Sequence, residues 1–252
     1  MSPNATRRRA LWTTLAVIAA VGLTHCPPKQ TQTDAGPVVK NKVKVQFFIM
    51  SQCPYGTQVQ EGIAPTLEKM GPYIDFKEDF IAQQAPDGSF SCLHGEPECK
   101  GNIAELCAAK HSPDKYFKMV LCMAKDRPGI PDNWKKCATE AGVDPAPIET
   151  CYSGQEGKDL LAASSKLAEE KGARGSPTIF VNDQPYRGGR TAEAFEIAVC
   201  MALPEAERPK TCPVVKESEL TILNDKRCKE CGVRAQSMKT QFESMFLKLK
   251  VN

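Results

Sequence analysis

Residues 42–56 read KVKVQFFIMSQCPYG. Apolar and polar residues alternate at the start of this segment, and an apolar run ends it before the turn, which predicts a β-strand entering a hydrophobic core. Pro54 suits the first position of a helix, because its missing N–H would have no partner there. The apolar residues that follow are spaced as in a helix: Val59, Ile63, Leu67 and Met70. The segment therefore predicts a strand, a short turn and a helix, with Cys53 between them.

Cys53 is the main candidate for chemistry. A thiol at a helix N-terminus faces the positive end of the helix dipole, which stabilises the thiolate. The thiolate is the nucleophile of thiol–disulfide exchange, so this position favours redox catalysis. Inert cysteines also follow core strands, and an unreactive Cys53 is the alternative.

A second junction lies downstream at Gly175-Ser176-Pro177-Thr178, just before the apolar residues 179–181. This pattern predicts a turn that leads into a short strand. An X-Pro bond between a loop and a strand suits a cis peptide, and an ordinary trans turn is the alternative.

The other segments predict an α/β layout rather than separate domains. Residues 71–72 end the first helix, a strand starts at residues 74–76, and residues 85–101 form a Pro-, Gly- and Cys-rich loop. We expect helices at residues 103–110, 115–125, 134–141, 158–171 and 191–201, and strands within residues 175–182 and 184–189.

Composition and charge exclude several classes of function. Hydrophobic residues make up 41% and charged residues 25% of the 252 residues, as in an ordinary globular protein. Three arginines, Arg7 to Arg9, account for the net charge of +3, and the remaining 30 bases face 30 acids. The overall charge of the chain therefore does not favour a nucleic-acid partner. The sequence also has no Gly-rich phosphate loop and no informative carboxylate pair that would indicate a kinase or hydrolase.

Residues 1–25 are typical of an export signal. The arginine cluster precedes an apolar run, residues 10–24, which is too short for a comfortable permanent membrane helix. Leu23-Thr24-His25-Cys26 resembles a bacterial lipobox, although His25 stands where a small residue is usual. We expect export to the periplasm or cell surface, with lipid attachment at Cys26 or, alternatively, simple cleavage nearby. The polar residues 26–41 read as a flexible tether.

Export places the cysteines in an oxidising compartment, where disulfides persist. Apart from Cys26, Cys53 and a pair near the C-terminus, eight of the 12 cysteines remain, an even number that predicts four structural disulfides: Cys92, Cys99, Cys107, Cys122, Cys137, Cys151, Cys200 and Cys212. Sequence alone leaves 105 connectivities open. Proximity along the chain favours the pairs 92–99, 137–151 and 200–212, which leaves 107–122. His94 is expected to form a hydrogen bond within its own loop.

Residues 213–252 predict a short strand, Cys228-Lys229-Glu230-Cys231 and an amphipathic helix. This order repeats the start of the first domain, so the segment is either an appendage or a truncated second unit. Cys228 and Cys231 could be a redox pair, a structural disulfide or half of a metal site. As a redox pair they could act as a second, resolving dithiol for Cys53.

The segment around Cys53 and the segment around Ser176-Pro177 resemble those of thioredoxin-like oxidoreductases of the DsbA type. A narrower resemblance lies in residues 92–107, which read CLHGEPECKGNIAELC. This segment is similar to the signature of the gamma-interferon-inducible lysosomal thiol reductase (GILT) family, with Leu93 in place of its Gln. The resemblance implies a thioredoxin-like fold over residues 42–212, with an inserted, disulfide-stapled helical region. It further implies that Cys53 is the nucleophile and that Ser176 and Pro177 shape the surface where a client docks.

One departure from that family concerns the second cysteine of its Cys-x-x-Cys site, because Gly56 occupies this position. A lone Cys53 needs an external thiol, a redox partner or a client cysteine to resolve a mixed disulfide. We therefore expect a reductase or isomerase that acts on cysteine-containing proteins, without a cofactor or metal. The alternatives are a non-catalytic client-binding module and a metal-handling lipoprotein that uses Cys228 and Cys231.

Overall fold

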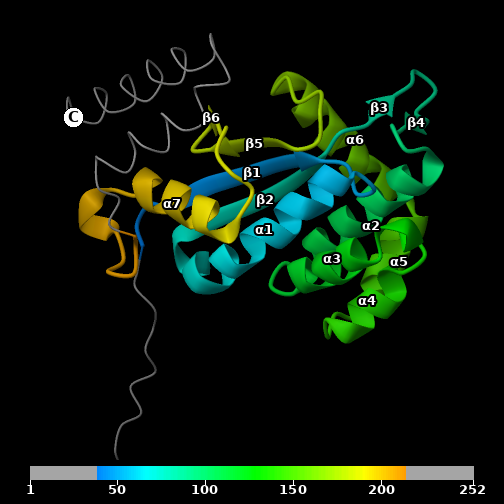
Figure 1. Ribbon diagram of the computed structural model, residues 1–252. Helices are drawn as coiled ribbons and strands as arrows, with labels where there is room; N and C mark the ends of the chain where they lie inside the picture. Colours follow the sequence, from blue (N-terminus) through cyan, green and yellow to red (C-terminus); the bar gives the residue numbers. More distant parts are fainter. Residues whose placement is uncertain (1–38, 214–252) are drawn as a thin grey trace, which may run out of the picture. The chain divides into compact units, whose positions relative to one another are not determined.

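The computed structural model describes residues 39–213 (Figure 1). Its main sheet has the strand order β2-β1-β5-β6. β1 (Val43–Ile49) runs parallel to β2 (Ile74–Phe80) and antiparallel to β5 (Thr178–Val181), which pairs with β6 (Gln184–Pro185). β3 (Gln83–Gln84) and β4 (Phe90–Ser91) form a separate two-stranded sheet.

The helices fall into a group around the sheet and an inserted group. α1 (Pro54–Met70), α6 (Gln155–Glu170) and α7 (Ala192–Ala202) accompany the strands. The inserted helices follow β4 in the chain and lie together in Figure 1: α2 (Glu96–His111), α3 (Tyr116–Lys125), α4 (Trp134–Glu140) and α5 (Pro145–Ser153). Single 3₁₀ turns occupy Gly71–Tyr73, Arg127–Gly129 and Glu205–Glu207.

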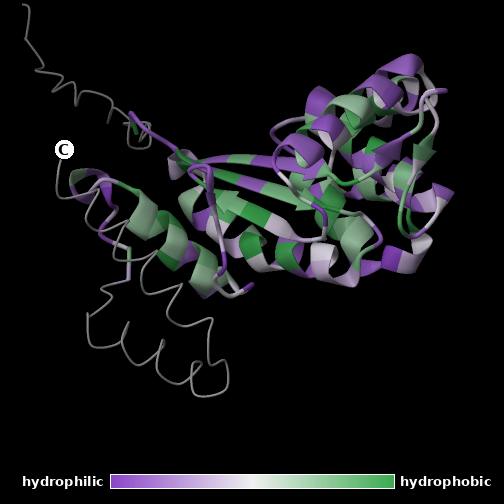
Figure 2. Cartoon of the chain, turned by 90° about the horizontal axis from the view of Figure 1, so that it is seen from above, coloured by the Kyte–Doolittle hydropathy of each residue, from purple (hydrophilic) through white to green (hydrophobic). Residues whose placement is uncertain are grey.

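The central strand β1 is buried on both faces. Phe47 packs against Phe195 of α7 at a ring-centroid distance of 5.6 Å. The next residue, Phe48, faces the other side and packs with Phe180 of β5 and Ala168 of α6. Because successive side chains of a strand point to opposite faces, the continuous apolar run of β1 fills two cores at once. Figure 2 shows apolar residues along the central strands and hydrophilic ones on outer helix surfaces.

The structure confirms the thioredoxin-like α/β fold with an inserted helical region, and it corrects the expected loop at residues 85–101. α2 begins within that loop, at Glu96. Glu96 and Glu98 lie in the first turn of α2, where carboxylates interact favourably with the helix dipole, and Pro97 is tolerated there. The Pro, Gly and Cys content of residues 85–101 led to the prediction of a loop in spite of these helix-start signals.

No helix was expected at α5, whose sequence contains Pro145 and Pro147. Both prolines lie in the first turn of the helix, where the backbone N–H needs no intrahelical partner. Asp144 caps the helix, and its carboxylate accepts a hydrogen bond from the Ala146 amide at 3.0 Å. The prolines therefore start a helix here rather than interrupt one.

All eight expected cysteines form disulfides, but two of the four pairings from the sequence were wrong. Pairs 92–99 and 200–212 are confirmed, whereas Cys107 bonds to Cys151 and Cys122 bonds to Cys137. Helix packing sets these pairings, since α4 lies against α3 and the unexpected α5 lies against α2. Proximity along the chain is a weak guide, because the entropy of closing a loop grows only slowly with its length.

Several predictions lie outside residues 39–213. These are the export signal with Cys26, most of the tether, and the C-terminal strand, Cys228-x-x-Cys231 and helix. Within the described residues, the helices are too short or too polar to cross a bilayer.

Two carboxyl groups are buried in the core between β2 and the inserted helices. Glu78 of β2 is paired in register with Phe47 of β1, and Glu105 of α2 accepts a hydrogen bond from the Gln60 amide at 3.0 Å. Burial raises the pKa of Glu78 to about 8, and the Asp79 carboxylate acts in the same direction. Burial also raises the pKa of Glu105 well above its usual value, with a further contribution from Glu78.

We expect the folded protein to be more stable at pH 5 than at pH 8. Between the carboxyl pKa of the unfolded chain, about 4.3, and the raised folded value, the folded state binds more protons. The free energy of unfolding therefore falls as pH rises through this window. Thermal unfolding at both pH values should show that Glu78→Gln removes part of the difference in Tm, whereas Glu68→Gln at an exposed site of α1 does not. An unchanged difference in Glu78→Gln would contradict this assignment.

Candidate active site

Cys53 is the N-cap residue of α1, directly after the turn that ends β1. Its amide donates to the Met50 carbonyl at 3.0 Å, and its carbonyl accepts the first helical hydrogen bond from Thr57. The residue is 7% exposed, and it is the one cysteine of residues 39–213 outside a disulfide. The structure thus places a free thiol at the positive end of the α1 dipole, as the sequence predicted.

The loop before β5 lies against Cys53. Pairing of β5 with β1 places Thr178 opposite Phe48 and so brings the Ser176-Pro177 peptide, which is cis, to the thiol. The Cys53 thiol donates to the Ser176 carbonyl oxygen at 3.7 Å. The Ser176 hydroxyl accepts a hydrogen bond from the Met50 amide at 3.1 Å. The three residues expected at the site, Cys53, Ser176 and Pro177, are therefore brought together from positions far apart in the chain.

Gly56 lies where a second cysteine would stand, and the space around it is filled. A Cβ atom at Gly56 would lie 2.9 Å from both the Met50 carbonyl oxygen and the Ser176 hydroxyl oxygen. Both distances are well below normal van der Waals contact. The Met50 carbonyl after β1 and the Ser176 side chain therefore crowd the position where a side chain at residue 56 would begin.

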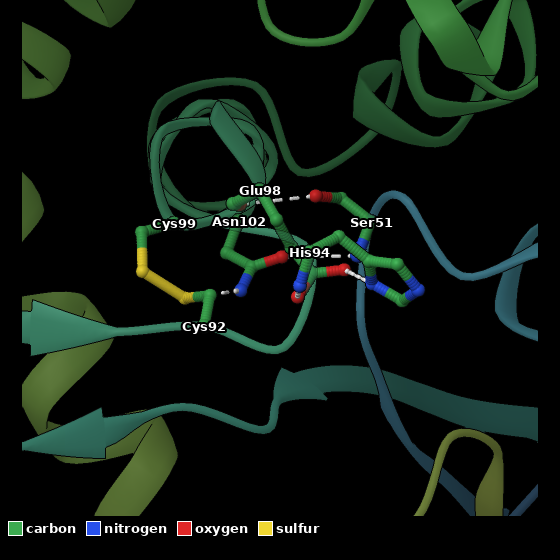
Figure 3. Close-up of a disulfide and its surroundings, with 6 residues drawn as sticks. All are labelled: Ser51, Cys92, His94, Glu98, Cys99 and Asn102. Carbon is green, nitrogen blue, oxygen red and sulfur yellow. Dashed lines mark hydrogen bonds and ion pairs between the residues drawn. A yellow bond between two sulfur atoms is a disulfide. The ribbon is translucent and has the colours of Figure 1, made fainter. Parts of the chain in front are cut away.

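A network from the inserted region fixes the turn before Cys53 (Figure 3). We call residues 92–102 the signature segment; it includes the Cys92–Cys99 disulfide and the first two turns of α2. Asn102 accepts a hydrogen bond from the Ser51 amide at 3.0 Å, and the Ser51 hydroxyl donates to the Glu98 carbonyl at 3.1 Å. The Asn102 amide group also donates to Cys92 Sγ at 3.8 Å. The signature segment thereby positions the turn two residues before the thiol.

Gly101 allows this close approach of α2 to the turn. A Cβ there would overlap the Ser51 hydroxyl oxygen and the Ile130 side chain. On the same side, Gln52 donates to the Ile130 carbonyl at 2.6 Å, and Arg127 donates to the Gln52 carbonyl at 3.0 Å. The turn is thus held through both Ser51 and Gln52.

His94 forms its bonds within the ring closed by Cys92 and Cys99, as the sequence predicted. Its imidazole Nδ1 and its backbone amide both bond to the buried Glu98 carboxylate. Sequence reasoning missed Ser51, Gln52, Gly101 and Asn102 as parts of the site. Asn102 belongs to the quoted signature and could have been found there, whereas nothing local marks Ser51.

The surface beside the thiol combines an aromatic ring with positive charge. Tyr55 is 59% exposed, and the Arg190 guanidinium lies over its ring at 5.3 Å. Arg190 also lines a groove of about 500 Å³ that begins at Pro177 and runs past β5 to Lys171 and Arg187. An extended peptide that reaches Cys53 would meet this surface.

Two family models match the described residues. The model "Gamma interferon inducible lysosomal thiol reductase (GILT)" matches residues 44–141, and the "DSBA-like thioredoxin domain" matches residues 116–199. The first match includes Cys53 and the signature segment, and the second includes Ser176 and Pro177. The chain thus resembles the GILT family and has a DsbA-like layout.

Curated relatives and solved structures agree with these matches. A gamma-interferon-responsive lysosomal thiol protein from Arabidopsis thaliana is 30% identical over 48% of this chain and 52% of the relative, so the chain spans about half of that protein. GILT-like protein 1 from Drosophila melanogaster is 25% identical over 68% of this chain and 78% of the relative.

Two solved structures share the fold. Oxidised BdbD from Bacillus subtilis has a TM-score of 0.51 and 16% identity, over 64% of this chain and 86% of that one. Reduced DsbG, a disulfide bond oxidoreductase from Mycobacterium tuberculosis, has a TM-score of 0.50 and 21% identity, over 68% of this chain and 80% of that one. At these identities the likeness concerns the fold alone.

We expect Asn102→Ala to loosen the turn that carries Cys53. The substitution leaves the buried Ser51 amide without its acceptor, which typically costs about 1–3 kcal/mol. Urea unfolding should show this loss, and alkylation of Cys53 by iodoacetamide, followed on its own peptide, should become several-fold faster. Asn182→Ala is the control, because the Asn182 side chain also accepts a hydrogen bond from a backbone amide, that of Lys44, at the opposite end of β1. Equal alkylation rates in the two variants would exclude a positioning role for Asn102.

We expect Gly56→Ala to destabilise the fold by about 1–3 kcal/mol, the usual range for overpacking. The cost should be smaller in a Ser176→Gly background, because one of the two crowding oxygens is then absent. Gly71→Ala is a matched control, since nothing lies within 4 Å of a Cβ at that helical glycine. If Gly56→Ala unfolds at the same urea concentration as Gly71→Ala, the crowding inferred here is wrong.

Proposed function

We propose that this protein carries out thiol–disulfide exchange on cysteine-containing client proteins outside the cytoplasm, with Cys53 as its nucleophile. The observation that carries the proposal is the free Cys53 thiol at the N-terminus of α1, in contact with the cis Ser176-Pro177 peptide. The family matches support the same chemistry, since both families are named for thiol or disulfide proteins.

The reaction begins when the Cys53 thiolate attacks one sulfur of a client disulfide. A new bond forms between Cys53 and that sulfur, the client disulfide breaks, and the other client sulfur leaves as a thiolate. An external thiolate then attacks the mixed disulfide at Cys53 and releases the reduced client thiol. A second external thiolate frees Cys53, so two external thiols leave as one disulfide. In an isomerase, a client thiolate replaces the external one.

Ser176 and Pro177 form the docking surface in this proposal. Pro177 has no N–H and directly precedes β5, whose Phe180 and Val181 pair with β6. A client segment extended along the loop at Ser176-Pro177 would place its disulfide beside Cys53. The exposed ring of Tyr55 and the groove that starts at Pro177 would then contact residues on either side of the client cysteine.

Export and membrane attachment complete the proposal. Four disulfides within residues 39–213 fit an oxidising compartment. The basic and apolar residues 1–25 would direct export, and lipidation at Cys26 would anchor the protein to a membrane surface. Cys228 and Cys231 would supply a resolving dithiol in place of the cysteine missing at Gly56.

A non-catalytic client-binding module is the second candidate, and the closed space around Gly56 favours it. A protein without a resolving thiol at the site can hold a client as a mixed disulfide or through its docking surface. The two functions differ in turnover, so a single assay distinguishes them.

The decisive assay measures reduction of insulin disulfides in excess glutathione. We expect the wild-type rate to exceed the glutathione background at least tenfold and Cys53→Ser to return it to that background. Cys228→Ser/Cys231→Ser should lower the rate only if the C-terminal pair resolves Cys53. Activity retained in Cys53→Ser would remove Cys53 as the nucleophile. A wild-type rate equal to the glutathione background would overturn the reductase and leave the client-binding module.

A further inference from the structure

A second cluster of reactive side chains lies among the inserted helices, away from Cys53. The ligand-type atoms of His111, Cys151 and Glu156 lie within 4.8 Å of one another. Cys107 joins them, since its sulfur is bonded to Cys151 at 1.99 Å. Two sulfurs, one imidazole and one carboxylate from α2, α5 and the start of α6 therefore meet at one place.

Helical geometry explains why these groups converge. Cys107 and His111 are four residues apart on α2, so they lie on the same face of that helix. Glu156 lies in the first turn of α6 and bonds to His111 Nε2 at 3.0 Å. Gly157 permits the close approach of α6, because a Cβ there would crowd the Cys151 carbonyl and touch Cys107 Sγ. The histidine and the carboxylate are thus held beside the disulfide.

We propose that reduction of the Cys107–Cys151 disulfide converts this cluster into a zinc site, with Cys107, Cys151, His111 and Glu156 as its four ligands. The set matches the chemistry of Zn²⁺, which binds thiolate, imidazole and carboxylate in tetrahedral sites at about 2.0–2.3 Å. The site adds to the proposed exchange function and does not depend on it.

The redox step is a disulfide exchange with small thiols. Two thiol molecules give up two electrons and leave as one disulfide, and the Cys107–Cys151 bond opens to two thiols. Zn²⁺ then displaces the two thiol protons as it binds the sulfurs. The disulfide and the zinc exclude each other, because both use the same sulfur atoms. Either of them links α2 to α5.

A hollow lies beside His111, one of the four proposed ligands. This residue lines a hollow of about 360 Å³ together with Asp114 and Asp144. The one lysine of the lining, Lys115, donates to the Gly142 carbonyl at 3.0 Å. The sulfurs themselves are fully buried. Of the four proposed ligands, His111 is thus the one that lines this hollow.

The Cys92–Cys99 ring is an internal control, because it contains the same residue types. His94 and Glu98 lie within that ring, yet Figure 3 shows the His94 imidazole pointing away from the disulfide and toward Glu98. Residue type alone therefore does not make the Cys107–Cys151 cluster distinctive. Its distinctive feature is the convergence of the ligand atoms.

The test uses the full chain with Cys26, Cys53, Cys228 and Cys231 replaced by Ser, so that only the eight cysteines of the four described disulfides remain. After reduction with a phosphine, ZnCl₂ binding is measured by native mass spectrometry, and Co²⁺ binding by its thiolate charge-transfer absorption. We expect one tightly bound ion after reduction and none before it. His111→Ala and Glu156→Gln should each weaken binding at least tenfold, whereas His94→Ala should not.

A second readout keeps the test valid if full reduction unfolds the protein. Zinc should slow re-formation of the Cys107–Cys151 disulfide at least tenfold relative to Cys122–Cys137, as mapped by differential alkylation. In His111→Ala this selective delay should disappear. Equal zinc binding by His111→Ala and His94→Ala, or equal slowing of the two disulfides by zinc, would overturn the assignment.

Discussion

Two buried backbone amides hold the reactive turn in place, and each depends on a side chain from a distant part of the chain. The Met50 amide donates to the Ser176 hydroxyl, and the Ser51 amide donates to the Asn102 side chain. A buried N–H without a partner costs about 1–3 kcal/mol, so both partners stabilise the turn. The cis-proline loop and the inserted helix α2 therefore meet at Cys53 for the same reason. This constraint explains why an inserted region that carries no reactive thiol of its own contributes directly to the site.

The same constraint bears on the missing second cysteine. The Ser176 hydroxyl accepts a hydrogen bond from the Met50 amide, and its oxygen also lies 2.9 Å from the position that a Cβ at Gly56 would take. The hydroxyl that accepts this hydrogen bond thus crowds the position where the side chain of a resolving cysteine would begin. The site is organised around one sulfur, and its chemistry must be completed by a thiol from elsewhere. In the proposed exchange, an external thiol, a client cysteine or the Cys228/Cys231 pair would meet that requirement.

The sequence was most informative where local rules decide the structure. β1, α1 and the loop at Ser176-Pro177 follow from apolar patterning and from proline and cysteine placement, and together they locate the thiol and the surface beside it. Ser51 and Gly101 could not be recognised in this way, because their roles depend on the close approach of α2 to a turn 50 residues earlier. The Cys107–Cys151 and Cys122–Cys137 pairings were missed for the same kind of reason. Each joins two packed helices, and packing between helices leaves no signal in the spacing of single residues.

The two histidine-containing disulfide rings show that residue type alone does not determine the chemistry of a cluster. In the Cys92–Cys99 ring, His94 precedes α2 and its imidazole is engaged by the buried Glu98 carboxylate, so the ring fastens the signature segment. In the Cys107–Cys151 ring, His111 follows Cys107 by one helical turn, which directs its imidazole to the same side as the sulfur. The same residue types thus occur in two arrangements: His94 bonds to Glu98 inside a short disulfide ring, whereas the ligand atoms of the proposed zinc site converge. The register of the histidine relative to the helix that carries the cysteine decides between them.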